Sequence, residues 1–362
     1  MLNRRTAKVV RVVCERPGAQ EIIVDLGGAE SPAIVYPDLT GSVAPGDEVL
    51  LNTTAVDLDL GTGGFHFVIC NLSSPAQPTA PSPGHIMKLR YTPLQESVVT
   101  VEEDDNSDQK RIQEFESLDG MPVICCELHS QIAPASAALK ALTDYKAKIA
   151  YIMTDGAALP IGFSRLAAEL KEKGILDATI TCGQAFGGDI EAINVYTALI
   201  AAREIARADA AIVCQGPGNA GAASKYGFSG IQQAETINAA GILGGTPIAV
   251  LRLSFADARE RHRGVSHHTR TVLGEIALRP ALVPVPNLDD EKARFVNEQL
   301  APILSRAGHQ VRVVDAAPGL DELKRKDVRV TTMGRSVEED REFFLAASAG
   351  GVLAAEILAG GR

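Results

Sequence analysis

Short apolar runs alternate with amphipathic segments from residue 121 onward, and this alternation constrains the fold more than any other feature of the sequence. The apolar runs predict strands over Pro122–Leu128, Lys148–Thr154, Ala178–Cys182, Ala210–Gln215, Pro247–Leu253, Leu282–Pro284, Val311–Val314 and Val328–Thr331. Segments with apolar residues three and four apart predict helices over Phe163–Glu172, Ile190–Arg207, Ile231–Ile242 and Glu291–Leu304. Apolar strands that alternate with helices indicate an α/β fold with a doubly wound, mostly parallel sheet.

The first 72 residues have a different pattern. Short runs of Val, Ile and Leu are separated by clusters of Gly and Pro, which predicts a small antiparallel, barrel-like β domain. The stretch 73–83 is polar and Pro-rich and predicts an extended linker. We therefore expect a β domain over residues 1–82 and an α/β domain over residues 83–362.

The segment Phe343–Leu358 predicts a helix with unusually small side chains. Small side chains let two backbones approach closely, so we expect this helix to pack tightly. Its neighbour is another element of the same chain or, alternatively, a second copy in a homo-oligomer.

Charge and cysteine content narrow the partners and the compartment. Lys and Arg total 35 against 45 Asp and Glu, and Trp is absent, which disfavours binding to nucleic acid or to an anionic membrane surface. No apolar run reaches the roughly 18 residues of a membrane span, and no signal peptide is evident. The six cysteines form no C-x-x-C pair, so we expect neither a zinc motif nor disulfides, and the cytoplasm is the expected compartment.

Polar residues and glycines follow five consecutive predicted strands. Because the carboxyl ends of parallel strands meet at one edge of a sheet, we expect a small-molecule site there. Outside the densest segment, the candidates are His129, Ser130, Asp155, Gln184, Asp189, Gly216, Gly218, Asn219 and Gly221. For Asp189 the alternative is the N-cap of the next helix.

The loop Gly216–Gly221 has the spacing G-x-G-x-x-G after a strand. An NAD site is disfavoured, because residues 222–227 intervene before the helix and no acidic residue ends the next strand. A loop that cradles a phosphate or carboxylate and a purely structural turn both stay open.

The segment Asp257–Thr269 carries the densest chemistry in the chain. Its arginines can clamp an anion and its histidines can transfer a proton near neutral pH. The expected anion clamps are Arg259, Arg261 and Arg263, and the expected catalytic residues are His262, His267, His268, Asp257 and Asp155.

Two other interpretations of this segment stay open. The histidines can instead bind a divalent metal ion, although their spacing matches no established metal motif. The segment can also be an exposed polar loop in which Ser266 or Thr269 caps the next helix.

Four runs resemble an uncharacterised bacterial family of similar length, the domain of unknown function 3866. They are Gly187–Asn194, Gln215–Gly218, Gly227–Gly230 and Ser254–Thr269, and the last is the most specific. The resemblance covers nearly the whole chain. It implies no activity, so it assigns no catalytic residue.

The expected function is an enzyme that acts on a small anionic substrate, a phosphorylated one included, at the carboxyl ends of the parallel strands. The alternative is a protein that senses a metabolite, or a scaffold, with the same pocket. The sequence leaves the substrate and any metal ion open.

Overall fold

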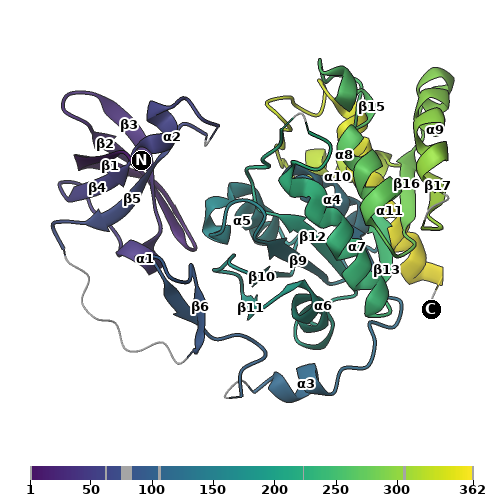
Figure 1. Ribbon diagram of the computed structural model, residues 1–362, viewed down its shortest axis with the longest axis horizontal. Coiled ribbons are helices and arrows are strands. Elements are labelled where there is room, and N and C mark those ends of the chain that lie inside the picture. The colour runs from purple at the N-terminus through teal and green to yellow at the C-terminus, as the bar shows by residue number, and fades with distance from the viewer. Residues whose placement is uncertain are drawn as a thin grey trace. The chain divides into compact units, whose positions relative to one another are not determined.

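The chain divides into two compact units (Figure 1). The computed structural model describes residues 2–61, 63–74, 84–104, 107–222, 224–304 and 307–360. The first unit comprises Met1–Val99 together with Pro160–Ala168, and the second comprises Thr100–Leu159 and Glu169–Arg362. Most of the expected linker, residues 75–83, lies outside the described residues, as does the expected domain boundary.

The first unit contains a closed five-stranded barrel. Its strands are β1 (Arg4–Arg16), β2 (Ala19–Asp25), β3 (Glu30–Val35), β4 (Glu48–Asn52) and β5 (His66–Asn71), in the order β1-β2-β3-β5-β4. All pairs are antiparallel except β3 and β5, which are parallel, so the barrel is mixed rather than purely antiparallel. This order is that of an OB-type Greek-key barrel. The barrel also carries two short helices, α1 (Pro37–Thr40) and α2 (Thr54–Asp57).

Residues 160–168 pack on the barrel, although they come from much later in the chain. A Cβ on Gly162 would lie 2.7 Å from the carbonyl of Gly18, so the two backbones can meet only because residue 162 is glycine. Arg16 donates to the backbone oxygen of Gly162 at 2.8 Å, and Arg165 pairs with the buried carboxylate of Glu21. Burial raises the pKa of Glu21, but its bonds to Arg165 and Arg16 lower the pKa by more than burial raises it, so the carboxylate stays ionised.

The first unit also contains a two-stranded hairpin of β6 (Ile86–Lys88) and β7 (Glu96–Val98).

The second unit is built on an eight-stranded sheet of order β11-β10-β9-β12-β8-β13-β16-β17. Every pairing in it is parallel, which confirms the predicted fold class. The strands are β8 (Pro122–Cys125), β9 (Ile149–Thr154), β10 (Ala178–Cys182), β11 (Ile190–Ala192), β12 (Ala210–Gln215), β13 (Thr246–Ala249), β16 (Leu282–Pro286) and β17 (Gln310–Val314).

Two sequence predictions about this unit are wrong. Residues 190–192 form the edge strand β11 rather than the start of a helix, and α6 (Val195–Glu204) begins after them. Asn194 caps α6, because its side chain accepts from the N–H groups of Tyr196 and Thr197. Residues 328–331 contain no strand, since the backbone there pairs with no neighbour of the sheet.

Helices cover both faces of the sheet. Val123 and Cys125 of β8 share a core with residues of α6 and of α7 (Gln232–Ile242). Between them, Ile124 points the other way and meets α11 (Arg341–Gly360), which packs with α4 (Ile132–Leu142) and α10 (Ala317–Arg325). The remaining helices of this unit are α3 (Gln109–Gln113), most of α5 (Arg165–Glu172), α8 (His267–Thr271), its π-helical continuation (Val272–Ile276) and α9 (Asp290–Leu304).

Helix α11 uses its small residues for close packing inside the chain. A Cβ on Gly351 would lie 2.0 Å from the backbone oxygen of Ala135 in α4. By length and composition alone α11 could cross a membrane, but 67% of its most apolar window is buried within the protein. The helix therefore behaves as a core helix, and the homo-oligomer stays a prediction.

Substituting Gly351 by Ala tests this packing. The added methyl group would overlap the α4 backbone, so we expect the free energy of unfolding to fall by about 1–3 kcal/mol. Gly360 is the matched control, because no atom of another element among the described residues lies within 4 Å of the place where its Cβ would be. Urea denaturation of Gly351→Ala and Gly360→Ala would contradict the packing if the two variants were equally stable.

Candidate functional site

The carboxyl ends of three neighbouring strands, β12, β8 and β13, meet at the candidate site. Glu127 follows β8, Gln215 ends β12 and Arg252 follows β13. The Gln215 amide donates to the backbone oxygen of Glu127 at 3.1 Å. This is the edge at which an open parallel sheet presents its ligand-binding loops.

Glu127 is a fully buried carboxylate with two partners. Its Oε1 accepts from Nη1 of Arg252 at 3.1 Å and lies 2.7 Å from Nδ1 of His268. Burial raises the pKa of this carboxyl, but the hydrogen bond from His268 and the charge of Arg252 outweigh burial and hold the pKa below its usual value. Glu127 therefore stays ionised and fixes the ring of His268.

His262, His267 and His268 form a compact group, which we call the histidine cluster. The ring centroids are 4.3 Å apart for His267 and His268, 4.9 Å for His262 and His267, and 5.1 Å for His262 and His268. One ligand nitrogen from each ring lies within 4.8 Å of the other two. The cluster is thus close enough to hold a metal ion.

The chain folds the cluster together through a short hairpin and a helix cap. Strands β14 (Leu253–Ser254) and β15 (Gly264–Val265) pair antiparallel and return the chain to the start of α8. The Ser266 hydroxyl accepts from the backbone N–H of His268 and caps α8, which confirms this residue as an N-cap. The same hydroxyl lies 2.8 Å from Nδ1 of His262.

Phe228 and Gly221 line the other side of His268. The rings of Phe228 and His268 stack at 3.8 Å with an interplanar angle of 3°. A Cβ on Gly221 would lie 3.5 Å from Cε1 of His268, so the end of the glycine loop borders the histidine cluster.

Two of the clustered histidines are neutral at pH 7. Burial, followed by the charges of Arg252 and Arg259, lowers the pKa of His262 to about 3. Burial, followed by the charges of His268 and Arg261, lowers the pKa of His267 to about 4. Neutral imidazoles can accept a proton or bind a metal ion, but they do not attract an anion.

The three expected arginine clamps lie in three different environments. Arg259 forms a two-pronged ion pair with Asp257, at 2.9 and 2.7 Å. The bond to Arg259 holds the pKa of Asp257 well below its usual range, although burial raises this pKa. Asp257 is therefore ionised, and Arg259 compensates its charge. Arg261 is exposed, and Arg263 lies 5.6 Å over the ring of Phe295.

A cavity of about 650 Å³ adjoins the histidine cluster through His267. Its lining includes three cationic side chains, Lys225, Arg261 and Arg270. Lys225 pairs with Glu275, which lines the cavity together with a second carboxylate, that of Glu298. Three cations against two carboxylates leave an excess of positive charge beside the imidazole of His267.

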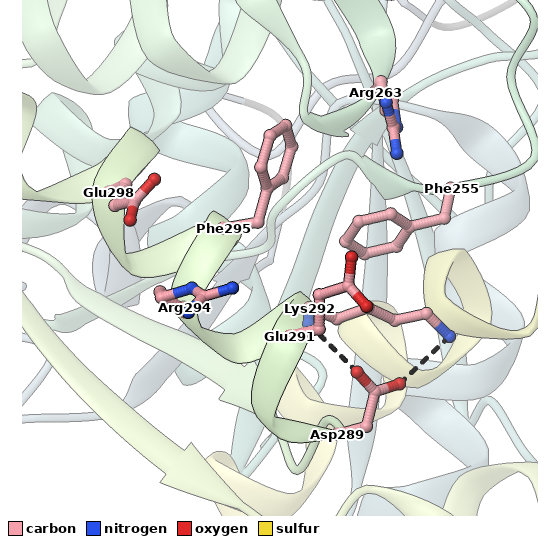
Figure 2. A pocket seen from close by; sticks show the side chains of 8 residues that line it. All are labelled: Phe255, Arg263, Asp289, Glu291, Lys292, Arg294, Phe295 and Glu298. Carbon is pink, nitrogen blue, oxygen red and sulfur yellow. Dashed lines mark hydrogen bonds and ion pairs between the residues drawn. The ribbon is translucent and has the colours of Figure 1, made fainter.

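Figure 2 shows the side chains that line a second cavity, whose volume is about 720 Å³. Phe295 and Glu298 line both cavities. The charged side chains of the second cavity carry both signs, and Asp289 bonds Lys292 in it. Arg263 lines this cavity rather than the one at His267. Because its charges compensate one another and no histidine lines it, it is the weaker candidate.

The glycine loop, Gly216–Gly221, is held in place by hydrogen bonds to other residues of the chain. Oδ1 of Asn219 accepts from Gln215, from the Ser229 hydroxyl at 2.6 Å and from the Gly230 N–H. A Cβ on Gly216 would lie 2.5 Å from the backbone oxygen of Ala158, and Gly218 has φ +102°. Gly216 and Gly218 are thus required by the path of the loop itself.

The other candidates lie around β9 and β10. Asp155 accepts from the Gln184 N–H at 2.9 Å and lines a cavity of about 250 Å³ with Gln232 and Glu235. Asp189 is not a helix cap, because it accepts from Thr179 and pairs with Lys171.

His129 and Ser130 lie in the turn that leads into α4. Nδ1 of His129 is 3.1 Å from the hydroxyl of Tyr151, and burial lowers the pKa of His129 to about 4. His129 therefore contacts the buried strand β9.

Sequence reasoning missed Glu127, Arg252, Phe228 and Arg270. A signal existed for the first two, because each is a charged residue inside an otherwise apolar predicted strand. Buried charges need partners, so two such residues of opposite sign predict an ion pair. For Phe228 and Arg270 the sequence offered no such signal.

Replacing Glu127 by Ala tests the buried ion pair. Arg252 and His268 would lose their acceptor, so we expect the free energy of unfolding to fall by about 3–5 kcal/mol. Glu114→Ala is the control, because Glu114 pairs with Lys110 on the surface, where an ion pair contributes about 1 kcal/mol at most. Chemical denaturation that found similar losses in both variants would contradict the assigned role.

Comparison with known proteins places the chain in a family. No curated protein matches it. A family model described as Protein of unknown function (DUF3866) matches residues 32–351, which include the last strands of the barrel, the whole sheet and the histidine cluster. The chain therefore belongs to the DUF3866 family of proteins of unknown function.

Proposed function

We propose that the chain is an enzyme that acts on a small anionic substrate in the cavity that His267 lines, beside the histidine cluster. The observation that carries the proposal is the cavity of about 650 Å³ in which His267 lies beside Arg261, Arg270 and Lys225. Its volume is within the range of about 300–1,000 Å³ that is usual for small-molecule sites.

Two of the cations lack an acidic partner. Arg261 and Arg270 form no ion pair with the residues that the structure describes, and Nε of Arg270 is buried without a hydrogen-bond partner. The charge of Lys225 is compensated by Glu275. We therefore assign the anion to Arg261 and Arg270, instead of the set Arg259, Arg261 and Arg263 expected from the sequence.

The histidine cluster provides the chemistry beside the bound anion. His267 is only partly buried and lines the cavity, whereas His262 and His268 are buried behind it. Glu127 fixes the ring of His268, as a carboxylate does for a catalytic or metal-binding imidazole. An oriented group of imidazoles supports turnover, because binding an anion requires only the arginines.

Metabolite sensing is the second candidate function. The cationic cavity supports it equally, since a sensor would hold the same anion without converting it. The proposal also includes a cytoplasmic location, which the six free cysteines support, and a small-molecule partner rather than nucleic acid, which the net charge of −10 supports.

Binding of inorganic phosphate, measured by titration calorimetry, tests the anion site. Each arginine would give a charge-assisted hydrogen bond, so we expect Arg261→Ala and Arg270→Ala to weaken phosphate binding about 10- to 100-fold. Arg263→Ala is the control, because Arg263 lines the other cavity. Equal affinities in all three variants and the parent protein would refute the assignment.

Turnover of a panel of phosphomonoesters and carboxylic esters then separates the two functions. An enzyme should convert one class of them, and His267→Ala should abolish conversion while phosphate binding persists. A parent protein that binds phosphate and converts none of the panel would favour the sensor.

A further inference from the structure

We propose that His262, His267 and His268 bind a divalent transition-metal ion of the zinc class. The starting observation is that one ligand nitrogen of each ring lies within 4.8 Å of the other two. Three nitrogens bound tetrahedrally to zinc at about 2.0–2.1 Å are about 3.3–3.4 Å apart. The three nitrogens therefore need to approach one another by at most about 1.5 Å to close the site around an ion.

Two rings of the cluster are held through Nδ1. Nδ1 of His262 faces the Ser266 hydroxyl at 2.8 Å, and Nδ1 of His268 faces Glu127 at 2.7 Å. Each ring is thus held through Nδ1, and its Nε2 is left for another ligand. Metal-binding histidines are characteristically held in this way by a second hydrogen-bonding partner, a carboxylate above all.

The tautomer of His268 follows from its neighbours. Arg252 can only donate, and it lies 3.1 Å from both Glu127 Oε1 and His268 Nδ1. The shorter contact, at 2.7 Å, joins Nδ1 to the carboxylate, so Nδ1 carries a proton and donates it to Glu127. Nε2 is then the nitrogen of His268 that can bind a metal ion.

His267 supplies the observation that a merely structural cluster does not explain. Its Nε2 is buried and has no hydrogen-bond partner among the described residues. A buried polar atom without a partner is costly, and it calls for an unseen partner or a functional role. A metal ion held between the three rings would satisfy this nitrogen.

The ligand set indicates the kind of ion. Three neutral imidazoles suit Zn²⁺, Co²⁺, Ni²⁺ or Cu²⁺, whereas Mg²⁺ and Ca²⁺ prefer oxygen ligands. Three protein ligands also leave a fourth position open, which is the pattern of catalytic rather than structural zinc sites.

The metal site also deepens the proposed function. The role of the ion in the reaction rests on that proposed function, whereas the metal site itself does not. Because His267 lines the cavity with Arg261 and Arg270, that cavity gives access to the open position. A bound ion would polarise an anionic substrate and lower the pKa of a water molecule. The imidazoles would then be ligands rather than proton carriers.

Metal binding is tested directly on untagged full-length protein that has been stripped with a chelator. We expect titration with Zn²⁺ to give one tight site per chain and Co²⁺ to give the visible spectrum of a tetrahedral ion. His262→Ala, His267→Ala and His268→Ala should each weaken Zn²⁺ binding at least 100-fold. His85→Ala, which removes an exposed histidine of the other unit, should leave it unchanged.

Glu127→Gln tests the hydrogen bond that holds His268. It keeps the side-chain shape but loses the charge that fixes His268, so we expect Zn²⁺ affinity to fall about 10- to 100-fold while the Co²⁺ spectrum stays tetrahedral. If a buried variant does not fold, as judged by circular dichroism, the partly exposed His267→Ala decides the question.

The outcomes separate the two proposals. Failure of the parent to bind Zn²⁺ and Co²⁺, or equal Zn²⁺ affinity in His267→Ala and the parent, overturns the metal site. Tight Zn²⁺ binding together with no phosphate binding and no turnover supports the metal site and overturns the proposed enzyme.

Discussion

The carboxylate of Glu127 has no exposure to solvent, and the arrangement of the site depends on this buried charge. An isolated buried charge is far too costly, so the fold must bring it a cation and hydrogen-bond donors. Arg252 and His268 meet this requirement, and they come from the loop after β13 and from α8. Compensating one charge therefore joins β8, β13 and α8 at the same edge of the sheet.

The position of the histidine cluster follows from this compensation. His268 is held between the Glu127 carboxylate and the flat face of Phe228, so its ring has a single orientation. Ser266 caps α8 and holds His262, which brings the second ring against the first. The same chain segment places Arg261 at the cavity that His267 lines. An acidic protein thus gathers positive charge and neutral imidazoles in one small region.

The sequence drew attention to this region, but it did not show how the residues of the region pair with one another. The expectation that polar residues gather where parallel strands end led to the histidines and to Arg261. It could not tell that Asp257 and Arg259, two residues apart, would neutralise each other. It also could not tell that Asp189 would accept a hydrogen bond from Thr179 of β10. An Asp that caps a helix and an Asp that bonds to a neighbouring strand can have the same local sequence. Glu127 and Arg252 were overlooked because a single charge within an apolar run does not disturb the predicted strand.

The sequence by itself determined the parallel sheet, its covering helices and the existence of a separate β domain. Those features arise from periodicities and turn residues that act over a few neighbouring positions. Only the tertiary structure decided that β3 and β5 pair in parallel to close the barrel, that β11 is a strand, and that Glu127 meets His268. The first and the last of these contacts join residues far apart in the chain, Ala33 with His66 and Glu127 with His268, the latter pair 141 positions apart. Their energy comes from closing a barrel, completing a sheet edge and compensating a buried charge, and no local pattern of residues encodes which distant partner will do so.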